Sequence, residues 1–413
     1  MSASDHGSQD TEEDTMSAAL EKAVAQESAT PTRVARGTVL AAAMLTIMAP
    51  AVIAPSLPAM REVFADVAGA DVLVRLVLTI TSLAIGISAP FAGMIADRIG
   101  RKPLLTASLV LYALAGVAGY FVDALGVLLV TRALLGVAVG GIMTAVSATI
   151  TDWFDGPKRA SFLGLQQAFA SIGGVVFLPL AGLLAASNWK SPFWIYAASA
   201  VIVPFALLAL RERPRGDASG PVVADDGGAR PAIFGPIAGL YLLAFLVTLA
   251  FYMAPTQLPF LLAQLGTGPA VVGAVIAATT LSSVGGALAF PSLRARWAPA
   301  VLTAASIALL GGGWILVGTA STVAQVVAGL LVGGFGVGLA VPNLNLRLSD
   351  LAPAALRGRI LSGLVTGIFL GQFLSPLVVQ PLIHLTGIGG AFGWSGLALV
   401  VGAIVALPLL RKI

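Results

Sequence analysis

The sequence has no cysteine and two histidines among its 413 residues, which excludes disulfides and thiolate metal sites. Charge is equally scarce, because Asp, Glu, Lys and Arg make up 10% of the chain where a soluble domain carries about 25%. With 58% hydrophobic residues, the chain cannot cover itself with a polar surface. The composition therefore predicts a protein that is solvated by lipid.

Acidic residues are missing from the middle of every apolar stretch. They occur in an acidic stretch at the start of the chain and at the ends of, or between, the apolar runs: Asp5, Asp10, Glu12, Glu13, Asp14, Glu21, Glu27, Glu62, Asp66, Asp71, Asp97, Asp123, Asp152, Asp155, Glu212, Asp217, Asp225, Asp226 and Asp350. An enzyme would need a nucleophile, a metal cluster or an acid–base pair inside the fold, and a channel would show a filter or a ring of charge. The sequence therefore predicts no enzyme, no metal and no cofactor.

Two polar segments divide the chain. Residues 1–33 mix acids with Ser, Thr and Gln and contain no sustained apolar run, a composition typical of disorder. Residues 211–231 are polar and rich in Gly, Pro and Asp. We expect a disordered acidic cytoplasmic tail at 1–33 and a cytoplasmic linker at 211–231, which separate two bundles at 34–210 and 232–413.

The remaining chain reads as a series of apolar runs, each near the roughly 20 residues that cross a bilayer as a helix. These runs predict twelve transmembrane helices, six on each side of the linker, at about 37–59, 74–96, 104–122, 124–151, 161–186, 190–210, 233–262, 270–292, 298–318, 321–347, 359–382 and 388–410. The predicted fold class is therefore an all-α polytopic membrane protein.

The positions of lysine and arginine predict the orientation of the spans. If both termini are cytoplasmic, only Arg61, Arg75, Arg132 and Lys190 of the 23 basic residues fall outside the cytoplasmic segments, as the positive-inside rule requires. This bias accounts for the basic pI near 9.6 without a nucleic-acid partner. We expect a monomer in the cell membrane (a bacterial inner membrane), crossing it many times.

The two halves repeat one another around the linker. PKRASFLGLQQAFASIGGVVFLPLAG leads into the fifth span, and AALRGRILSGLVTGIFLGQFLSPLVV leads into the eleventh. Both have basic residues first, then Gly and Gln, then a deeper Pro. Paired six-helix repeats are typical of secondary transporters that bind their substrate between the repeats near the middle of the membrane. The repeat predicts two pseudo-symmetric bundles with a shared site.

The stretch GMIADRIGRKP concentrates charge between the second and third spans. It resembles the signature loop of the major facilitator superfamily through Gly93, Asp97, Arg98, Gly100, Arg101 and Lys102. Gly93 would let another helix approach closely, Asp97 suits the positive N-terminal end of a helix, and Gly100 would permit a sharp turn.

The resemblance implies a gating latch. It places Asp97 near the start of the eleventh span, around 357–359, and it makes Asp152 a partner for the basic pair Arg101 and Lys102. A plain topology signal would explain the basic residues but not Asp97 or the two glycines.

Two further segments resemble motifs of this superfamily. LLVTRALLGVAVG resembles its second motif through Arg132, Gly136 and Gly140. GVVFLPLAG keeps Gly174, Pro179 and Gly182 of a helix-bending antiporter motif, with Leu178 and Leu183 where that motif has glycine. An arginine at the depth of Arg132 costs about 2.5–3.5 kcal/mol unless it is partnered or wet. It serves either as a structural bond to carbonyls of the first span or in proton or substrate coupling.

The resemblance implies a transporter of a small organic molecule, most like the proton-antiporting drug and metabolite exporters with twelve spans. Because no acid lies in mid-membrane, we expect a neutral, zwitterionic or anionic cargo. The candidate contacts are polar residues at mid-depth: Gln372, Gln167, Thr248, Thr280 and Asn343. Protons are the expected coupling ion, with Asp97, Asp123, Asp71 or His384 as possible binding residues. An uptake carrier, an uncoupled facilitator and a membrane receptor of the same fold stay open.

Overall fold

The computed structural model describes residues 31–210, 234–353 and 356–410, and within these ranges the chain is helical with no strands. The expected acidic tail lies outside the described residues except for its last three positions, and so do the expected linker and the residues 354–355 before the eleventh span. The predicted all-α class is confirmed.

The first half contains seven α-helices and two short 3₁₀ helices. Its elements are α2 (Arg33–Ala51), η1 (Ala54–Ser56), α3 (Leu57–Val63), α4 (Ala70–Ile99), α5 (Arg101–Ala118), α6 (Leu125–Trp153), α7 (Gly156–Ser187), η2 (Ser191–Ala197) and α8 (Ala198–Ala209). The second half consists of α9 (Phe234–Phe251), α10 (Met253–Gln264), α11 (Pro269–Arg294), α12 (Pro299–Gly318), α13 (Val323–Leu351) and α14 (Arg357–Leu410).

These elements make twelve crossings. Ten helical segments of the described residues are long and apolar enough to span a membrane. One of them, within α14, holds two crossings, because Gly387 has a non-helical backbone (φ 74°, ψ 173°) that interrupts the helix there. The remaining crossing is α5, whose 18 residues pack along α6 and α8.

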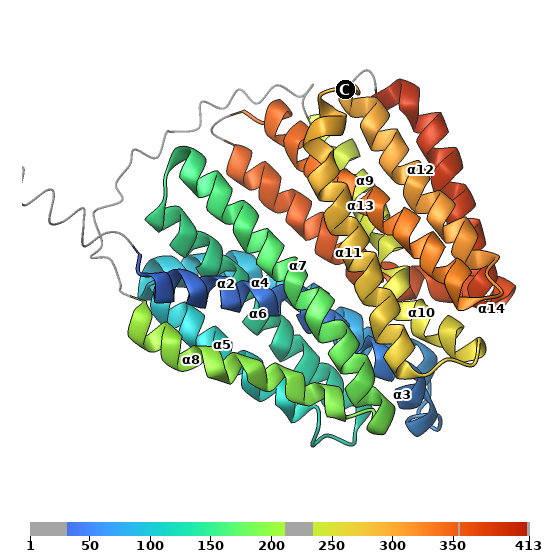
Figure 1. Cartoon of the computed structure of the whole chain (residues 1–413), viewed down its shortest axis with the longest axis horizontal. Helices are drawn as coiled ribbons and strands as arrows, with labels where there is room; N and C mark the ends of the chain where they lie inside the picture. Colours follow the sequence, from blue (N-terminus) through green and yellow to red (C-terminus); the bar gives the residue numbers. More distant parts are fainter. Residues whose placement is uncertain (1–30, 211–233, 354–355, 411–413) are drawn as a thin grey trace, which may run out of the picture.

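Proline breaks the first span and the corresponding span of the second half at matching places. Helix α2 ends at Ala51 and η1 follows, within the sequence APSLP at 54–58; α9 ends at Phe251, just before APTQLP at 254–259. Proline lacks the N–H that a continuous helix needs. Each half therefore carries a short helix after the break, α3 or α10, and these two helices contact one another (Figure 1).

The two halves form separate groups of helices, blue to green and yellow to red in Figure 1. They meet along two helix pairs, α4 with α14 and α7 with α11. We call this boundary the seam. Helix α4 runs along the seam from Asp71 to Asp97, and we name the two ends of the molecule the Asp71 end and the Asp97 end.

Glycine sets the distance between helices inside the second half. A Cβ built on Gly313 of α12 would lie 2.4 Å from the carbonyl oxygen of Gly329 of α13, and one on Gly329 would lie 2.6 Å from the carbonyl oxygen of Gly313. Small residues of this kind let helix backbones approach closely in membranes, where packing rather than water drives association.

Gly313→Ala should destabilise the protein, whereas Gly312→Ala should not. The Cβ at 313 meets backbone that cannot yield, but a Cβ at 312 meets nothing within 4 Å. Overpacking of this kind costs about 1–3 kcal/mol. Thermal unfolding in detergent measures the difference, and equal melting temperatures for the two variants would contradict the packing described here.

Candidate functional site

One face of α4 follows the seam from end to end. Arg75, Thr79, Ser82, Gly86 and Gly93 recur at intervals of three, four and seven residues, so they lie on the same side of the helix. The contacts of each position with the second half therefore show whether the two halves touch at that level of the seam.

At the Asp71 end the seam is closed. The buried Arg75 guanidinium donates from Nε to the side-chain oxygen of Gln257 in α10, at 2.8 Å. The same guanidinium lies 4.1 Å from the centre of the Phe260 ring, also in α10.

Half-way along the seam, neutral polar side chains meet. Ser82 Oγ donates to Gln372 Oε1 of α14 at 2.8 Å, and it lies 3.5 Å from the hydroxyl of Tyr252, the residue between α9 and α10. One turn further along α4, a Cβ on Gly86 would be 3.2 Å from Cβ of Phe369. We call Ser82, Tyr252 and Gln372 the floor cluster.

Beyond this point the halves separate. Gly93 lies two turns past Gly86 on the same face, yet a Cβ there would meet no atom of the described residues within 4 Å. The α7–α11 pair is close at the Asp71 end, where a Cβ on Gly182 would lie 2.6 Å from the carbonyl oxygen of Pro269. The seam thus closes at the Asp71 end and parts toward the Asp97 end, and the floor cluster lies one turn inside its closed part.

The charged loop forms a network inside the first half. Arg101, at the start of α5, has Nε 3.0 Å from Oδ2 of Asp152 at the end of α6, and Nη2 3.7 Å from Oδ1 of Asp97 at the end of α4. Gly100 joins α4 to α5 with φ 100° and ψ 164°, a backbone that favours glycine. Arg101 therefore ties together the ends of three helices.

The structure does not test the expected latch between Asp97 and the start of the eleventh span. The Asp97 side chain is 75% exposed, and Arg98 on the next position is exposed as well. The side chains at 357–359 lie outside the described residues. The latch stays a prediction for a conformation in which the Asp97 end is closed.

Arg132 lies inside the first half, away from the seam. Its Nη2 donates to the carbonyl oxygens of Ala115 and Gly116 in α5, at 2.7 and 2.9 Å. Its guanidinium also lies 4.8 Å from the Phe193 ring centre and 5.0 Å from that of Tyr196. The carbonyls belong to the third span, not to the first as the sequence suggested, because Gly116 leaves room for Tyr196 against α5: a Cβ there would be 2.2 Å from Tyr196 Cβ.

The other predicted contact residues divide between the seam and the helix packing. Thr280 of α11 lies at the seam, where a Cβ on Gly174 of α7 would be 3.3 Å from its methyl carbon. Thr248 bonds the carbonyl oxygens of its own helix, and the buried Asn343 donates to Thr303 Oγ1 and to the Pro299 carbonyl, which ties α13 to α12. Gln167 is exposed on α7.

Two residues of the antiporter motif lie in different surroundings. Gly182 sits against α11, as described above. Pro179 lies inside α7, which runs as one helix from Gly156 to Ser187.

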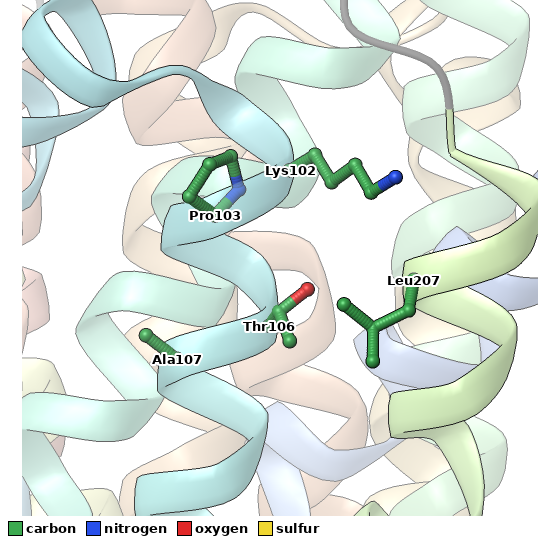
Figure 2. A pocket seen from close by; sticks show the side chains of 5 residues that line it. All are labelled: Lys102, Pro103, Thr106, Ala107 and Leu207. Carbon is green, nitrogen blue, oxygen red and sulfur yellow. The ribbon is translucent and has the colours of Figure 1, made fainter.

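A groove of 570 Å³ lies between α5 and α8 (Figure 2). Lys102, Pro103, Thr106 and Ala107 line one wall and Leu207 the other. Both helices belong to the first half, and neither is one of the helices paired across the seam. The groove therefore does not lie on the seam.

Sequence reasoning did not assign the seam residues Arg75, Gln257, Ser82 and Tyr252 to the site. Arg75 carried a signal, as an arginine four residues after Asp71 in an apolar run. Gln257 carried a weaker signal, as an amide side chain within a proline-rich helix break. Ser82 and Tyr252 resemble many other polar residues of apolar helices, and only their meeting across the seam distinguishes them.

The family model of the Major Facilitator Superfamily matches residues 39–376. The chain belongs to this superfamily, whose members are transporters rather than enzymes. It is a multi-pass membrane protein with two pseudo-symmetric six-helix bundles.

Relatives of known name differ in cargo. The chain is 26% identical over 334 residues to the 3-(3-hydroxy-phenyl)propionate transporter of Escherichia coli (strain K12), covering 78% of this chain and 80% of that one. It is 26% identical over 393 residues to the class C tetracycline resistance protein of Escherichia coli, covering 86% and 92%. Among solved structures, a D-xylose-proton symporter matches with a TM-score of 0.75 at 14% identity, covering 91% and 96%.

Arg132→Ala should reduce stability and leave substrate affinity unchanged. It removes two charge-assisted hydrogen bonds and the packing on two rings, worth about 3 kcal/mol of unfolding free energy together, at a place the seam does not reach. Unfolding in detergent and a substrate-binding titration measure the two effects. A variant of normal stability that no longer binds or transports would instead assign Arg132 to coupling.

Proposed function

We propose that this protein carries a small organic molecule across the bacterial inner membrane by alternating access of a site at the floor cluster. The observation that carries the proposal is the seam, which is closed at the Asp71 end by Arg75 and Gln257 and parts toward the Asp97 end beyond Gly86. A substrate entering from the Asp97 end would meet the Gly86–Phe369 contact first, and parting of that contact would bring it to Ser82, Tyr252 and Gln372, one turn further in.

The Asp97 end is proposed to face the cytoplasm, with both termini there. The loop with Arg98, Arg101 and Lys102 lies at this end, as does the α11–α12 connection with Arg294 and Arg296. Positive charge accumulates on the cytoplasmic side of membrane proteins. The conformation would then be the inward-facing one, and the Asp97 latch would close in the outward-facing one. The functional unit is proposed to be a monomer.

The proposed cargo is neutral, zwitterionic or anionic. The floor cluster offers hydroxyl and amide groups, which donate and accept hydrogen bonds without charge. Asp71 and Asp97, the acids of α4, lie near its two ends, far from Ser82. A permanently cationic substrate would lose its hydration at the floor cluster and find no negative charge there. The free-energy cost of that desolvation is high.

Export driven by a proton gradient is the proposed direction and coupling. The residues Gly174, Pro179 and Gly182 support it through their resemblance to antiporters. A relative is named for resistance to tetracycline. The relative named for a hydroxyphenylpropionate favours the second candidate, carriage of an organic acid in either direction.

Flux into proteoliposomes tests the proposal directly. Neutral, zwitterionic and anionic probes should move by a saturable route, while a permanently cationic probe should not. A proton gradient directed opposite to the substrate should raise the rate at least about fivefold, as expected when each proton shifts the equilibrium by 1.4 kcal/mol for every pH unit.

Two controls separate carrier from leak. Protein-free liposomes should show no saturation, and an ionophore that collapses the gradient should remove the acceleration. Gln372→Leu should raise KM because it removes a floor acceptor, whereas Gln325→Leu, on a half-buried position in the first turn of α13 and away from the seam, should not. Saturable transport that ignores the gradient would refute proton coupling and leave the carrier, and absence of flux for every probe class would refute the carrier.

A further inference from the structure

We propose that Arg75 of the first half and Gln257 with Phe260 of the second half form the gate that closes the Asp71 end. The proposal rests on the alternating access proposed above, and it names the residues whose separation exposes the floor cluster to the other side of the membrane.

The gate is a contact between halves and is sealed from water. Arg75 is 4% exposed and Gln257 is not exposed at all. The guanidinium reaches α10 in two ways, by the hydrogen bond to Gln257 and by stacking over the Phe260 ring, the arrangement in which a cation is attracted to an aromatic face. Both partners come from the second half, so parting of the halves at this end would break the contact.

The charge of Arg75 is balanced by its own half. Its Nη1 donates to the Asp71 carbonyl oxygen, and it lies 4.0 Å from the Asp71 carboxylate, which also bonds Arg61 of α3. The partners across the seam, an amide and a phenyl ring, are neutral. When the halves part, Arg75 keeps its counter-ion, and no ion pair has to be pulled apart. A contact of this kind closes the end and can still be released.

Buried polar atoms near the gate also favour release. Gln257 Nε2, Thr79 Oγ1 and Ser375 Oγ are buried and have no hydrogen-bond partner within the described part of the chain. Thr79 lies on the seam face of α4, and Ser375 lies one turn past Gln372 on α14. A buried donor or acceptor without a partner carries a desolvation cost, which water entering an opened seam would remove.

The sequence repeat places Gln257 as an addition in the second half. APSLP at 54–58 and APTQLP at 254–259 correspond around their helix breaks, and the second has one residue more, Gln257 itself. The two short helices after the breaks are therefore not equivalent. The second half supplies the acceptor, and α4 of the first half supplies the arginine.

The experiment uses the natural absence of cysteine. Ser375→Cys places one thiol in the closed seam, where the residue is fully buried, and Ser321→Cys places one on an exposed position between α12 and α13 at the same end. A membrane-impermeant maleimide is added from that side, and the labelling rate of each thiol is measured with full-length protein in membranes.

Opposite substitutions should move the Ser375→Cys rate in opposite directions. Arg75→Ala and Gln257→Ala remove the contact from either side and should raise the rate roughly fivefold or more, as a shift in a two-state population does. Gln257→Glu puts a carboxylate opposite Arg75, creates an ion pair across the seam and should lower the rate several-fold. The Ser321→Cys rate should stay constant in all three backgrounds.

Unchanged labelling of Ser375→Cys in both alanine variants would overturn the gate, as would faster labelling in Gln257→Glu. Gln257→Ala retains the Arg75–Asp71 pair, so it serves if Arg75→Ala does not fold. Labelling requires no transport, and the two proposals are therefore separable. If the substitutions change the labelling rate of Ser375→Cys but the protein transports none of the probes, the proposed function is refuted and the gate is not. If the protein transports a probe but the labelling rate is the same in all variants, the gate is refuted and the proposed function is not.

Discussion

The constraint on which this structure depends is that hydrocarbon accepts charge only where a partner replaces water. Arg132 satisfies it with carbonyl oxygens and two aromatic rings, and Arg75 satisfies it with Asp71 and a ring from the other half. The remaining charges of the loop at Asp97 lie at the end of the bundle. The groups in the middle of the seam are therefore neutral: hydroxyls, amides and glycine.

Glycines and polar residues have different roles along α4. Where the halves must approach, small residues let backbones or neutral side chains meet, as at Gly86 and Ser82; where they part, Gly93 faces open space. A single helical face thus passes from closed to open within about five turns. Because the same face would have to close at Gly93 when it opens at Arg75, the two ends of α4 cannot be closed by the same tilt of the bundles.

The sequence predicted the elements far better than the seam. Hydropathy located the crossings, because they follow from local composition. The Arg101–Asp152 proximity was implied by the resemblance of the charged loop to the superfamily signature. The helix breaks after Ala51 and Phe251 were predictable from the sequence, because prolines follow both positions. The floor cluster was not, because a hydrogen bond from Ser82 to Gln372 depends on how two bundles lie together, and no local property of either residue encodes that. Asn343 failed as a contact for the same reason, since its partner on α12 was unknown.

The two ends of the molecule share one electrostatic rule although their residues differ. At the Asp97 end, Arg101 pairs with Asp97 and Asp152; at the Asp71 end, Arg75 and Arg61 pair with Asp71; and all of these residues belong to the first half. A carrier must open each end in turn, so strong ion pairs between halves would hold it in one state. At the Asp71 end, the described contacts across the seam are an amide and a ring, and the ion pairs lie within the first half. This arrangement lets that end close and still open with the energy that substrate binding supplies.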